Sequence, residues 1–171
     1  MTAEQDLIEP ARALLDLCRA KRLTIAAAES CTGGLLAATL TEIPGSSDVF
    51  DRGFVTYSNA AKTAMLGVSA DLLAAFGAVS EETARAMASG ALIRADVDLA
   101  VAITGIAGPG GAMPGKPVGL VHFAAASRGG LIRHQTRPFG DIGRGPVRRA
   151  SVLQALAMLH VLAEQTDRRS P

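Results

Sequence analysis

Cysteine and aromatic residues are scarce in this chain of 171 residues, and each shortage excludes a class of protein. The two cysteines, Cys18 and Cys31, cannot build the disulfide framework of a small secreted domain. No spacing of Cys and His residues resembles a zinc site. Aromatic residues make up only 4% of the chain and tryptophan is missing, so aliphatic and small side chains must fill the core.

The chain also lacks a long apolar run and an excess of one charge. Glu, Asp, Arg or Gly interrupts each apolar run before it could cross a bilayer. The N-terminus carries Glu4, Asp6 and Glu9 and does not resemble a signal peptide. A formal net charge of +1 gives no electrostatic reason to expect nucleic acid or an anionic membrane as a partner. We therefore expect a cytoplasmic protein with neither kind of partner.

Helix and strand signals alternate along a length that suits one domain, residues 1–171. Apolar residues recur every three or four positions from Leu7 to Cys18, which predicts a helix that ends near Lys21. The apolar runs 23–28 and 99–103 are typical of strands covered on both faces. A third strand is expected over 50–57, and further helices over 35–40, after the caps Ser58, Ser69 and Ser80, and over 147–164, where Pro146 suits the first helical position.

A hairpin signal completes the pattern near the C-terminal third. Arg-Gly-Gly at 128–130 separates the runs 120–127 and 131–139, which predicts two antiparallel strands joined by a tight turn. Helix-separated strands followed by a hairpin predict a single three-layer α/β domain, with a mixed β-sheet flanked by helices. The spacing leaves the strand order open. The polar tail, about 165–171, is expected to fray.

Two segments that follow predicted strands are candidates for a functional site. Residues 28–34 read Ala-Glu-Ser-Cys-Thr-Gly-Gly and form a strand-to-helix corner that offers a hydroxyl, a thiol and free backbone N–H groups. Residues 105–119 form a long loop of mostly Gly and Pro. Ligands of open α/β sheets bind beyond the carboxyl ends of strands, so we expect the site at these two segments.

Three familiar motifs are near misses. Residues 110–116 match most of a P-loop, but Pro117 stands where magnesium needs Ser or Thr, and the prolines prevent the following helix. Residues 105–111 lack the dinucleotide G-x-G-x-x-G spacing. Tyr57 and Lys62 are one residue too far apart to share a helical face as the Tyr/Lys couple of short-chain dehydrogenases does.

Nucleophilic hydrolysis is the remaining hypothesis. Ser30 could attack a carbonyl if a base removes its proton and N–H donors hold the oxyanion. The three histidines of the chain lack the spacing of a triad and are interpreted as ordinary surface or edge residues. Lys62 can act as the base if desolvation or nearby cations lower its pKa. Cys31 is a rival nucleophile, because a thiol at a helix start can have a lowered pKa.

Five motifs in order carry a resemblance to a known family. They are Ala-Glu-Ser-Cys-Thr-Gly-Gly (28–34), Gly-Phe-Val-Thr-Tyr-Ser-Asn (53–59) with Lys62, Gly-Ala-Val-Ser (77–80), Thr-Gly-Ile-Ala-Gly-Pro (104–109) and Lys-Pro-Val-Gly (116–119). From about Leu7 to Leu159 the chain resembles the CinA C-terminal domain family, whose stand-alone members are nicotinamide-nucleotide amidohydrolases, or NMN deamidases.

The resemblance implies hydrolysis of the carboxamide of nicotinamide mononucleotide to nicotinate mononucleotide and ammonia, in pyridine-nucleotide salvage. Ser30 would be the nucleophile, Lys62 the base or proton shuttle, and Tyr57 a hydroxyl that orients or relays. Ser30 is preferred to Cys31 on the strength of this resemblance. Members of the family need no metal and no organic cofactor.

An anionic mononucleotide requires phosphate donors around the catalytic groups. Helix N-terminal amides at the corner, the backbone of residues 105–111 and arginines at the start of the last helix could supply them. Glu29 could orient Lys62, answer the pyridinium charge or form an ordinary buried salt bridge. The expected substrate-binding residues are Glu29, Cys31, Thr32, Gly33, Gly34, Asn59, Thr104, Gly105, Gly108, Arg144 and Arg148.

Two features depart from the family pattern. Residues 141–146, Asp-Ile-Gly-Arg-Gly-Pro, stand where a more polar Gly-Asp-Arg-like turn is expected. The printed chain does not include the N-terminal nucleotide-processing domain of many relatives, so only the amidohydrolase part is implied. A non-catalytic nucleotide-binding or competence-linked interaction module is the alternative function. Alanine-rich helices and a hairpin edge suggest a homodimer.

Overall fold

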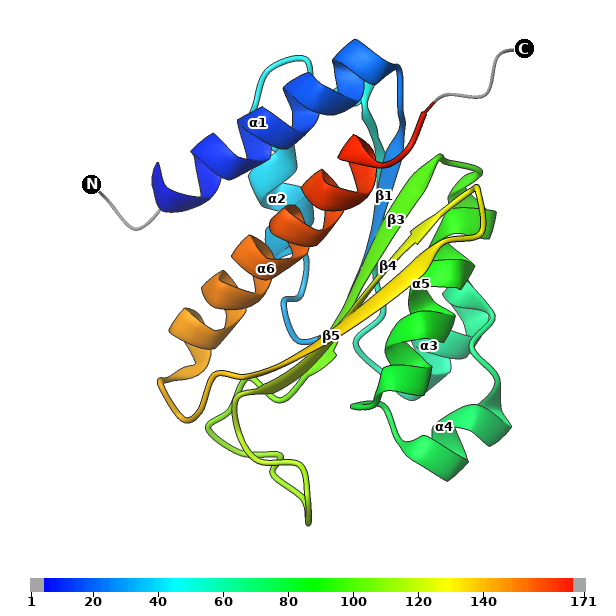
Figure 1. Cartoon of the computed structure of the whole chain (residues 1–171). Helices are drawn as coiled ribbons and strands as arrows, with labels where there is room; N and C mark the ends of the chain where they lie inside the picture. Colours follow the sequence, from blue (N-terminus) through cyan, green and yellow to red (C-terminus); the bar gives the residue numbers. More distant parts are fainter. Residues whose placement is uncertain (1–4, 168–171) are drawn as a thin grey trace.

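One five-stranded sheet separates two layers of helices in the computed structural model, which describes residues 5–167 (Figure 1). The strands are β1 (Ile25–Glu29), β2 (Phe50–Val55), β3 (Leu99–Gly105), β4 (Leu120–Ser127) and β5 (Ile132–Pro138). Their order is β2-β1-β3-β4-β5, with β1 parallel to both of its neighbours and β4 antiparallel to both of its own. The predicted α/β class, mixed sheet and β4–β5 hairpin are confirmed.

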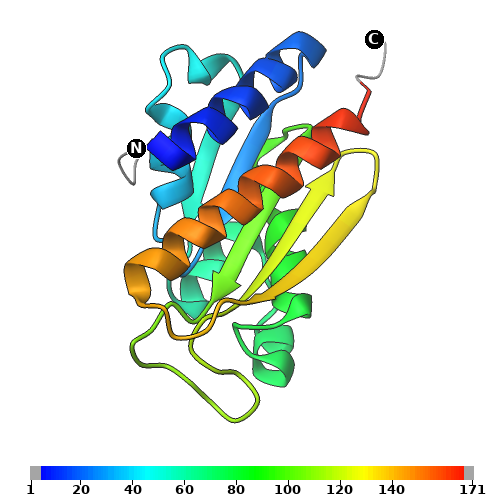
Figure 2. The same cartoon turned by 60° about the vertical axis from the view of Figure 1, so that its left-hand side comes forward.

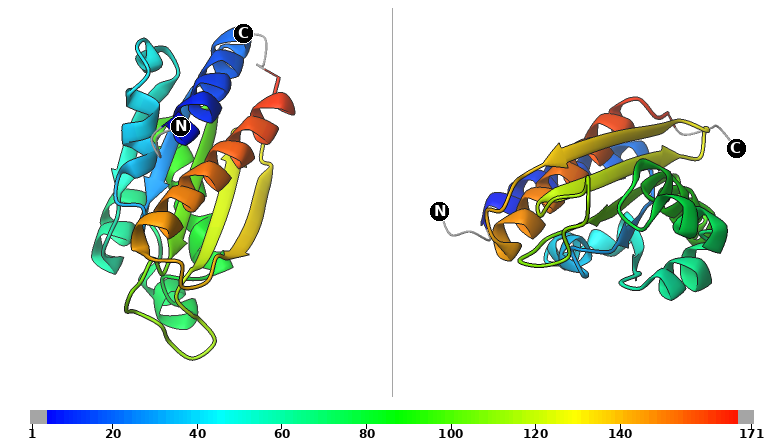
Figure 3. Two further views of the ribbon diagram at one scale, coloured as in Figure 1. Left: turned by 90° about the vertical axis from the view of Figure 1, so that its left-hand side faces the viewer. Right: turned by 90° about the horizontal axis from the view of Figure 1, so that it is seen from below.

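The helices divide between the two faces of the sheet. They are α1 (Gln5–Lys21), α2 (Leu35–Thr41), α3 (Asn59–Leu66), α4 (Ala70–Phe76), α5 (Glu81–Ala95) and α6 (Arg144–Glu164), with a 3-10 turn at Ser46–Asp48. α1, α2 and α6 cover one face, and α6 runs along the sheet beside α1 (Figure 2). α5 packs on the other face, with α3 and α4 against it, as the end-on view in Figure 3 shows. No helix within residues 5–167 is long and apolar enough to span a bilayer.

Strand β3 shows how side-chain size sets the two layers apart. Val101 and Ile103 pack on the α1 and α6 side, whereas Ala100 and Ala102 face α5. The small side chains let α5 lie close to the sheet. Gly90 in α5 is equally constrained, because a Cβ there would lie 2.1 Å from the carbonyl oxygen of Leu66 in α3. The scarcity of aromatic residues thus corresponds to a core built on close backbone approach.

Local signals located most element boundaries. The side chains of Ser58, Ser69 and Ser80 accept hydrogen bonds from the first turns of α3, α4 and α5, as predicted. The start of the last helix was predicted wrongly, since α6 begins at Arg144 and Pro146 occupies its third position. α6 ends at Glu164, and residues 168–171 of the predicted frayed tail lie outside the described residues.

The sheet order brings the carboxyl ends of β1, β2 and β3 to one edge. The chain leaves β1 through α2 to reach β2 on one side, and β3 lies on the other side of β1. Ligands of open α/β sheets bind at such a switch point. Loop 105–119, which follows β3, projects from the same end of the molecule, at the bottom of Figure 1. Both segments singled out from the sequence therefore lie at this edge.

Candidate active site

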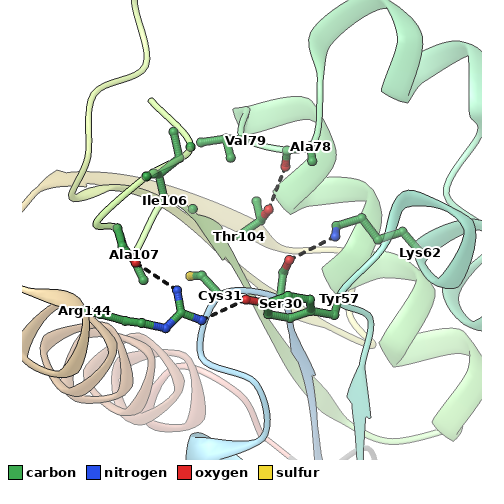
Figure 4. A pocket seen from close by; sticks show the side chains of 14 residues that line it. Ser30, Cys31, Tyr57, Lys62, Ala78, Val79, Thr104, Ile106, Ala107 and Arg144 are labelled. Atoms are coloured by element: carbon green, nitrogen blue, oxygen red, sulfur yellow. Dashed lines mark hydrogen bonds between the residues drawn. The ribbon is translucent and has the colours of Figure 1, made fainter. Parts of the chain in front are cut away.

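A cavity of about 250 Å³ opens at this edge of the sheet. Its walls come from the ends of the three parallel strands, from α3, from the segment before α5, from loop 105–119 and from the start of α6. The lining residues are Ser30, Cys31, Tyr57, Lys62, Ala78, Val79, Thr104, Gly105, Ile106, Ala107, Gly108, Gly110, Gly111 and Arg144. Figure 4 shows that these side chains converge from segments far apart in the sequence.

The side chains of Ser30 and Lys62 meet in this cavity. Ser30 follows the last residue of β1, and its N–H donates to the carbonyl oxygen of Ile103 in β3, which holds the corner against the sheet. Lys62 projects from α3 toward it, and Lys62 Nζ lies 3.0 Å from Ser30 Oγ (Figure 4). The same amine donates to the carbonyl oxygen of Thr56 at 2.8 Å. The nucleophile and base expected from the sequence are thus in hydrogen-bonding contact.

Burial decides the protonation of Lys62. Its side chain is 1% exposed, and within residues 5–167 no carboxylate lies within 4 Å of its amine. Loss of water around the ammonium group lowers the pKa of Lys62 below its ordinary value. A lysine without a counter-ion and with a lowered pKa can accept a proton from a hydroxyl.

Cys31 lies in the same cavity, but its pKa shifts in the direction opposite to that of Lys62. Burial raises the pKa of the Cys31 thiol to about 12, and the nearby Glu29 charge adds to the increase. The expectation of a lowered pKa at the helix start is therefore wrong for this thiol. The thiolate is the nucleophilic form of cysteine, so the environment of Cys31 disfavours it as the rival of Ser30.

The position of Glu29 corrects two expectations. Its carboxylate is fully buried and accepts hydrogen bonds from the N–H groups of Gly34 (3.1 Å), Leu36 (3.0 Å) and Ala37 (2.9 Å) in the first turn of α2. It caps this helix and has no hydrogen bond to Lys62 or place in the cavity lining. The helix amides expected to hold phosphate are also taken, because Gly34 donates to Glu29 and Gly33 donates to the carbonyl oxygen of Ser30.

The two arginines at the start of α6 have different roles. Arg148 donates to the carbonyl oxygen of Thr32 through Nη2 (2.7 Å) and Nε (3.3 Å) and supports the corner from outside the cavity. Arg144 lines the cavity, where Nη2 donates to the Tyr57 hydroxyl at 2.8 Å and Nη1 to the carbonyl oxygen of Gly108 at 3.0 Å. The glycine-rich turn before α6 therefore places Arg144 at the cavity, whereas Arg148, also expected to bind substrate, does not line it.

Eight predicted residues line the cavity, and six do not. The lining set is Ser30, Cys31, Tyr57, Lys62, Thr104, Gly105, Gly108 and Arg144, and the residues outside it are Glu29, Thr32, Gly33, Gly34, Asn59 and Arg148. Asn59, the first residue of α3, lies in a separate groove between α3 and α4.

Sequence reasoning missed part of the opposite wall. Ala78, Val79, Ile106 and Ala107 line the cavity, and Thr104 Oγ1 donates to the carbonyl oxygen of Ala78 at 2.6 Å. The Gly-Ala-Val-Ser segment at 77–80 is one of the five family motifs, and this was the sequence signal that could have placed it at the site. Across residues 5–167, no three His, Cys, Asp or Glu side chains gather closely enough to bind a metal ion.

Known structures share this fold over almost the whole chain. The competence/damage inducible protein CihA of Agrobacterium tumefaciens superposes with a TM-score of 0.91 and 53% identity, covering 94% of this chain and 96% of that one. The competence damage-inducible protein A (ComA) of Klebsiella pneumoniae gives a TM-score of 0.88 at 37% identity, covering 94% and 99%. At these identities the likeness extends beyond the fold to the family.

Curated relatives are longer than this chain. A CinA-like protein of Mycolicibacterium gilvum is 55% identical over 136 residues, which are 80% of this chain and 32% of the relative. A putative competence-damage inducible protein of Symbiobacterium thermophilum is 51% identical over 146 residues, 80% of this chain and 34% of the relative. The chain spans about a third of the length of these relatives. Residues 8–163 match the family described as the CinA C-terminal domain, and the chain therefore belongs to the CinA C-terminal domain family.

Proposed function

We propose that this domain hydrolyses the carboxamide of nicotinamide mononucleotide, with Ser30 as nucleophile and Lys62 as general base. The observation that carries the proposal is the buried Lys62 amine, which lies 3.0 Å from Ser30 Oγ without a carboxylate partner among the described residues. Hydrolysis of an amide needs a base that can accept a proton, and burial lowers the pKa of Lys62 toward that role.

The reaction follows from the two groups and water. Ser30 Oγ attacks the carboxamide carbon while its proton passes to Lys62 Nζ. The tetrahedral intermediate collapses, the C–N bond breaks, and the lysine proton goes to the leaving nitrogen, so that ammonia departs and an ester remains on Ser30. Water then attacks the ester carbon, with Lys62 again taking the proton and returning it to Ser30 Oγ. The products are nicotinate mononucleotide, ammonia and the free enzyme.

The cavity walls suit the rest of this substrate. Val79 and Ile106 supply apolar surface for a pyridine ring. Arg144 is the cation that can pair with phosphate at the cavity mouth. Within the described chain, the N–H groups of Gly108, Gly110 and Gly111 have no acceptor at hydrogen-bonding distance and can donate to phosphate or to the oxyanion.

Ammonia release by purified variants tests the proposal. Wild type, Ser30→Ala and Lys62→Met are compared on nicotinamide, its riboside, its mononucleotide and the dinucleotide. Ser151→Ala is the matched control, because this buried serine donates to the carbonyl oxygen of Val147 within α6, away from the cavity. We expect release from the mononucleotide by wild type and the control, and a loss of about 10²-fold or more in the other two variants.

Two outcomes would contradict the proposal. Full activity in Ser30→Ala would remove the assigned nucleophile. Tight binding of the mononucleotide by wild type without ammonia release would favour a non-catalytic nucleotide-binding module, in keeping with the competence-related names of the relatives.

A further inference from the structure

A chain of polar side chains crosses the α5 face of the sheet outside the cavity. His122 in β4 and His134 in β5 face each other, with His122 Nδ1 3.1 Å from His134 Nε2. His134 Nδ1 lies 3.3 Å from Glu81 Oε2 in the first turn of α5. Thr136 Oγ1 lies within 3.4 Å of both facing nitrogens. These contacts link the edge strand β5 to the start of α5.

The Glu81 carboxylate determines which nitrogens carry protons. An ionised carboxylate only accepts, so His134 must hold its proton on Nδ1 and leave Nε2 as an acceptor. Two groups can donate to His134 Nε2, and His122 Nδ1 at 3.1 Å is nearer than Thr136 Oγ1 at 3.4 Å. His122 therefore also carries its proton on Nδ1, and its Nε2 lone pair remains available for another proton. Arg85 holds Glu81 in place through a 2.7 Å ion pair.

We infer that Glu81, His134 and His122 form a proton-storing chain that clamps β5 to α5, in which a first added proton binds His122 Nε2 with the chain intact and a second one opens it. After the first protonation, His122 Nδ1 still donates to His134 Nε2 and the bond becomes charge-assisted. A second proton can bind only His134 Nε2. Two N–H groups then face each other, and the contact between the imidazoles is lost.

Repulsion between the two imidazoles separates the two protonation steps, and the surrounding charges act on both. Burial lowers the pKa of His122, the neighbouring His134 and Lys116 lower it further, and Glu81 and Glu82 oppose them. Burial also lowers the pKa of His134, where Glu81 and Glu82 act upward and Arg85 acts downward. Interacting groups of this kind titrate in macroscopic steps that belong to the pair.

Opening of this clamp has a structural consequence for the hairpin. β5 is an edge strand, and most of its side chains are exposed. On the α5 side, the His134 contact with Glu81 and a 3.4 Å hydrogen bond from Arg85 to the carbonyl oxygen of Ile132 tie it to the helix. The clamp also lies beside the cavity wall, since Glu81 closely follows Val79 and His122 pairs with Thr104 across β3 and β4. Acid opening removes the imidazole contact between β4 and β5 and leaves the His134–Glu81 contact in place, so it should perturb β5 on its β4 side.

Imidazole ¹⁵N spectra of the intact chain test the inference without any activity assay. With His160 on α6 as the internal reference, we expect His122 and His134 both to carry the proton on Nδ1 at pH 8. On acidification, one proton should bind His122 Nε2 while β5 amide signals stay in place, and the β5 amides should shift only during the second step. Finding His134 protonated on Nε2 at pH 8, or β5 shifting in the first step, would overturn the inference.

Two glutamates in one helical turn provide matched variants. Glu81→Gln removes the carboxylate that fixes the His134 tautomer, so a population protonated on Nε2 should emerge. Glu82→Gln removes a neighbouring charge that has no hydrogen bond or ion pair with either imidazole, and it should keep both Nδ1 protons. Thr136→Val should also keep them, because the two nitrogens contact each other directly. Unchanged tautomers in Glu81→Gln, or loss of both in Glu82→Gln, would contradict the chain.

Discussion

Replacement of Lys62 by Met should remove catalysis and also change how stability depends on pH. Methionine fills a similar volume without the amine, so the base is lost while the packing is largely kept. General-base catalysis contributes about 10²- to 10⁴-fold, which corresponds to roughly 3–5 kcal/mol of transition-state stabilisation. We expect ammonia release to fall by that factor. In wild type, kcat/KM should rise with pH as the Lys62 amine becomes neutral.

The stability effect has a definite sign. The pKa of Lys62 is lowered on folding from its ordinary value of 10.5, so the unfolded chain binds more protons than the folded chain between the two values. Stability therefore rises with pH in this window, by up to about 1.4 kcal/mol per pH unit. Lys62→Met should lose this slope. The pKa of Cys18 and Cys31 is raised to about 12 on folding, which gives the opposite slope above about pH 9.

Urea unfolding at several pH values between about 7 and 10 measures both effects. The cysteine contribution is common to wild type and variant, so it cancels in the difference between them. The difference, wild type minus variant, should grow with pH for Lys62→Met. Lys116→Met, which removes a partly exposed amine that donates to the carbonyl oxygen of Phe76, is the matched lysine control. A flat difference for Lys62→Met would falsify the claim that burial lowers the pKa of Lys62, and with it the assignment as base.

Three further predictions concern the residues around the catalytic pair. Cys31→Ala should keep ammonia release within about twofold of wild type. Iodoacetamide should modify the wild-type Cys31 thiol only slowly near pH 8, because burial raises its pKa to about 12. Rapid alkylation with loss of activity would favour Cys31 as the nucleophile. Arg144→Met should raise KM for the mononucleotide more than for the riboside, and equal effects on both substrates would contradict a role of Arg144 in phosphate binding. Arg148→Met should instead lower the free energy of unfolding by about 1–3 kcal/mol. Glu29→Gln should destabilise the fold by about 1–3 kcal/mol in urea unfolding because three α2 amides lose a charged acceptor, and unchanged stability would contradict this capping role.

Local sequence signals were sufficient for most of the secondary structure. Serine caps and glycine C-caps act within one turn of their own helix, so Ser58, Ser69, Ser80 and Gly67 could be read from neighbouring residues. Strand order could not be read in this way, because it depends on which strands pair across long connections. The start of α6 was misplaced since Pro146 is compatible with more than one position in a first helical turn.

The residues of the candidate site also divide into those that local motifs predict and those that depend on long-range contacts. Ser30, Lys62 and Thr104 could be named because they belong to motifs at the ends of predicted elements, and they line one cavity. The partners of Glu29 and Arg148 could not be named. Each depends on contacts that appear only when α2 and α6 pack on the sheet. The sequence does not distinguish a buried carboxylate that pairs with Lys62 from one that caps a helix.

Glu29 and Lys62 lie on opposite faces of the sheet, and this separation supports the proposed role of Lys62 as a base. Side chains alternate along β1, so Ala28 faces α5 whereas Glu29 points to the opposite layer. There the α2 amides neutralise the carboxylate. Lys62 approaches from α3 on the α5 side and meets Ser30 and a backbone carbonyl instead of a counter-ion. A carboxylate at Lys62 would raise its pKa and keep it protonated. By capping α2, Glu29 therefore gives the corner its shape and does not pair with the Lys62 amine, as the proposed role of Lys62 requires.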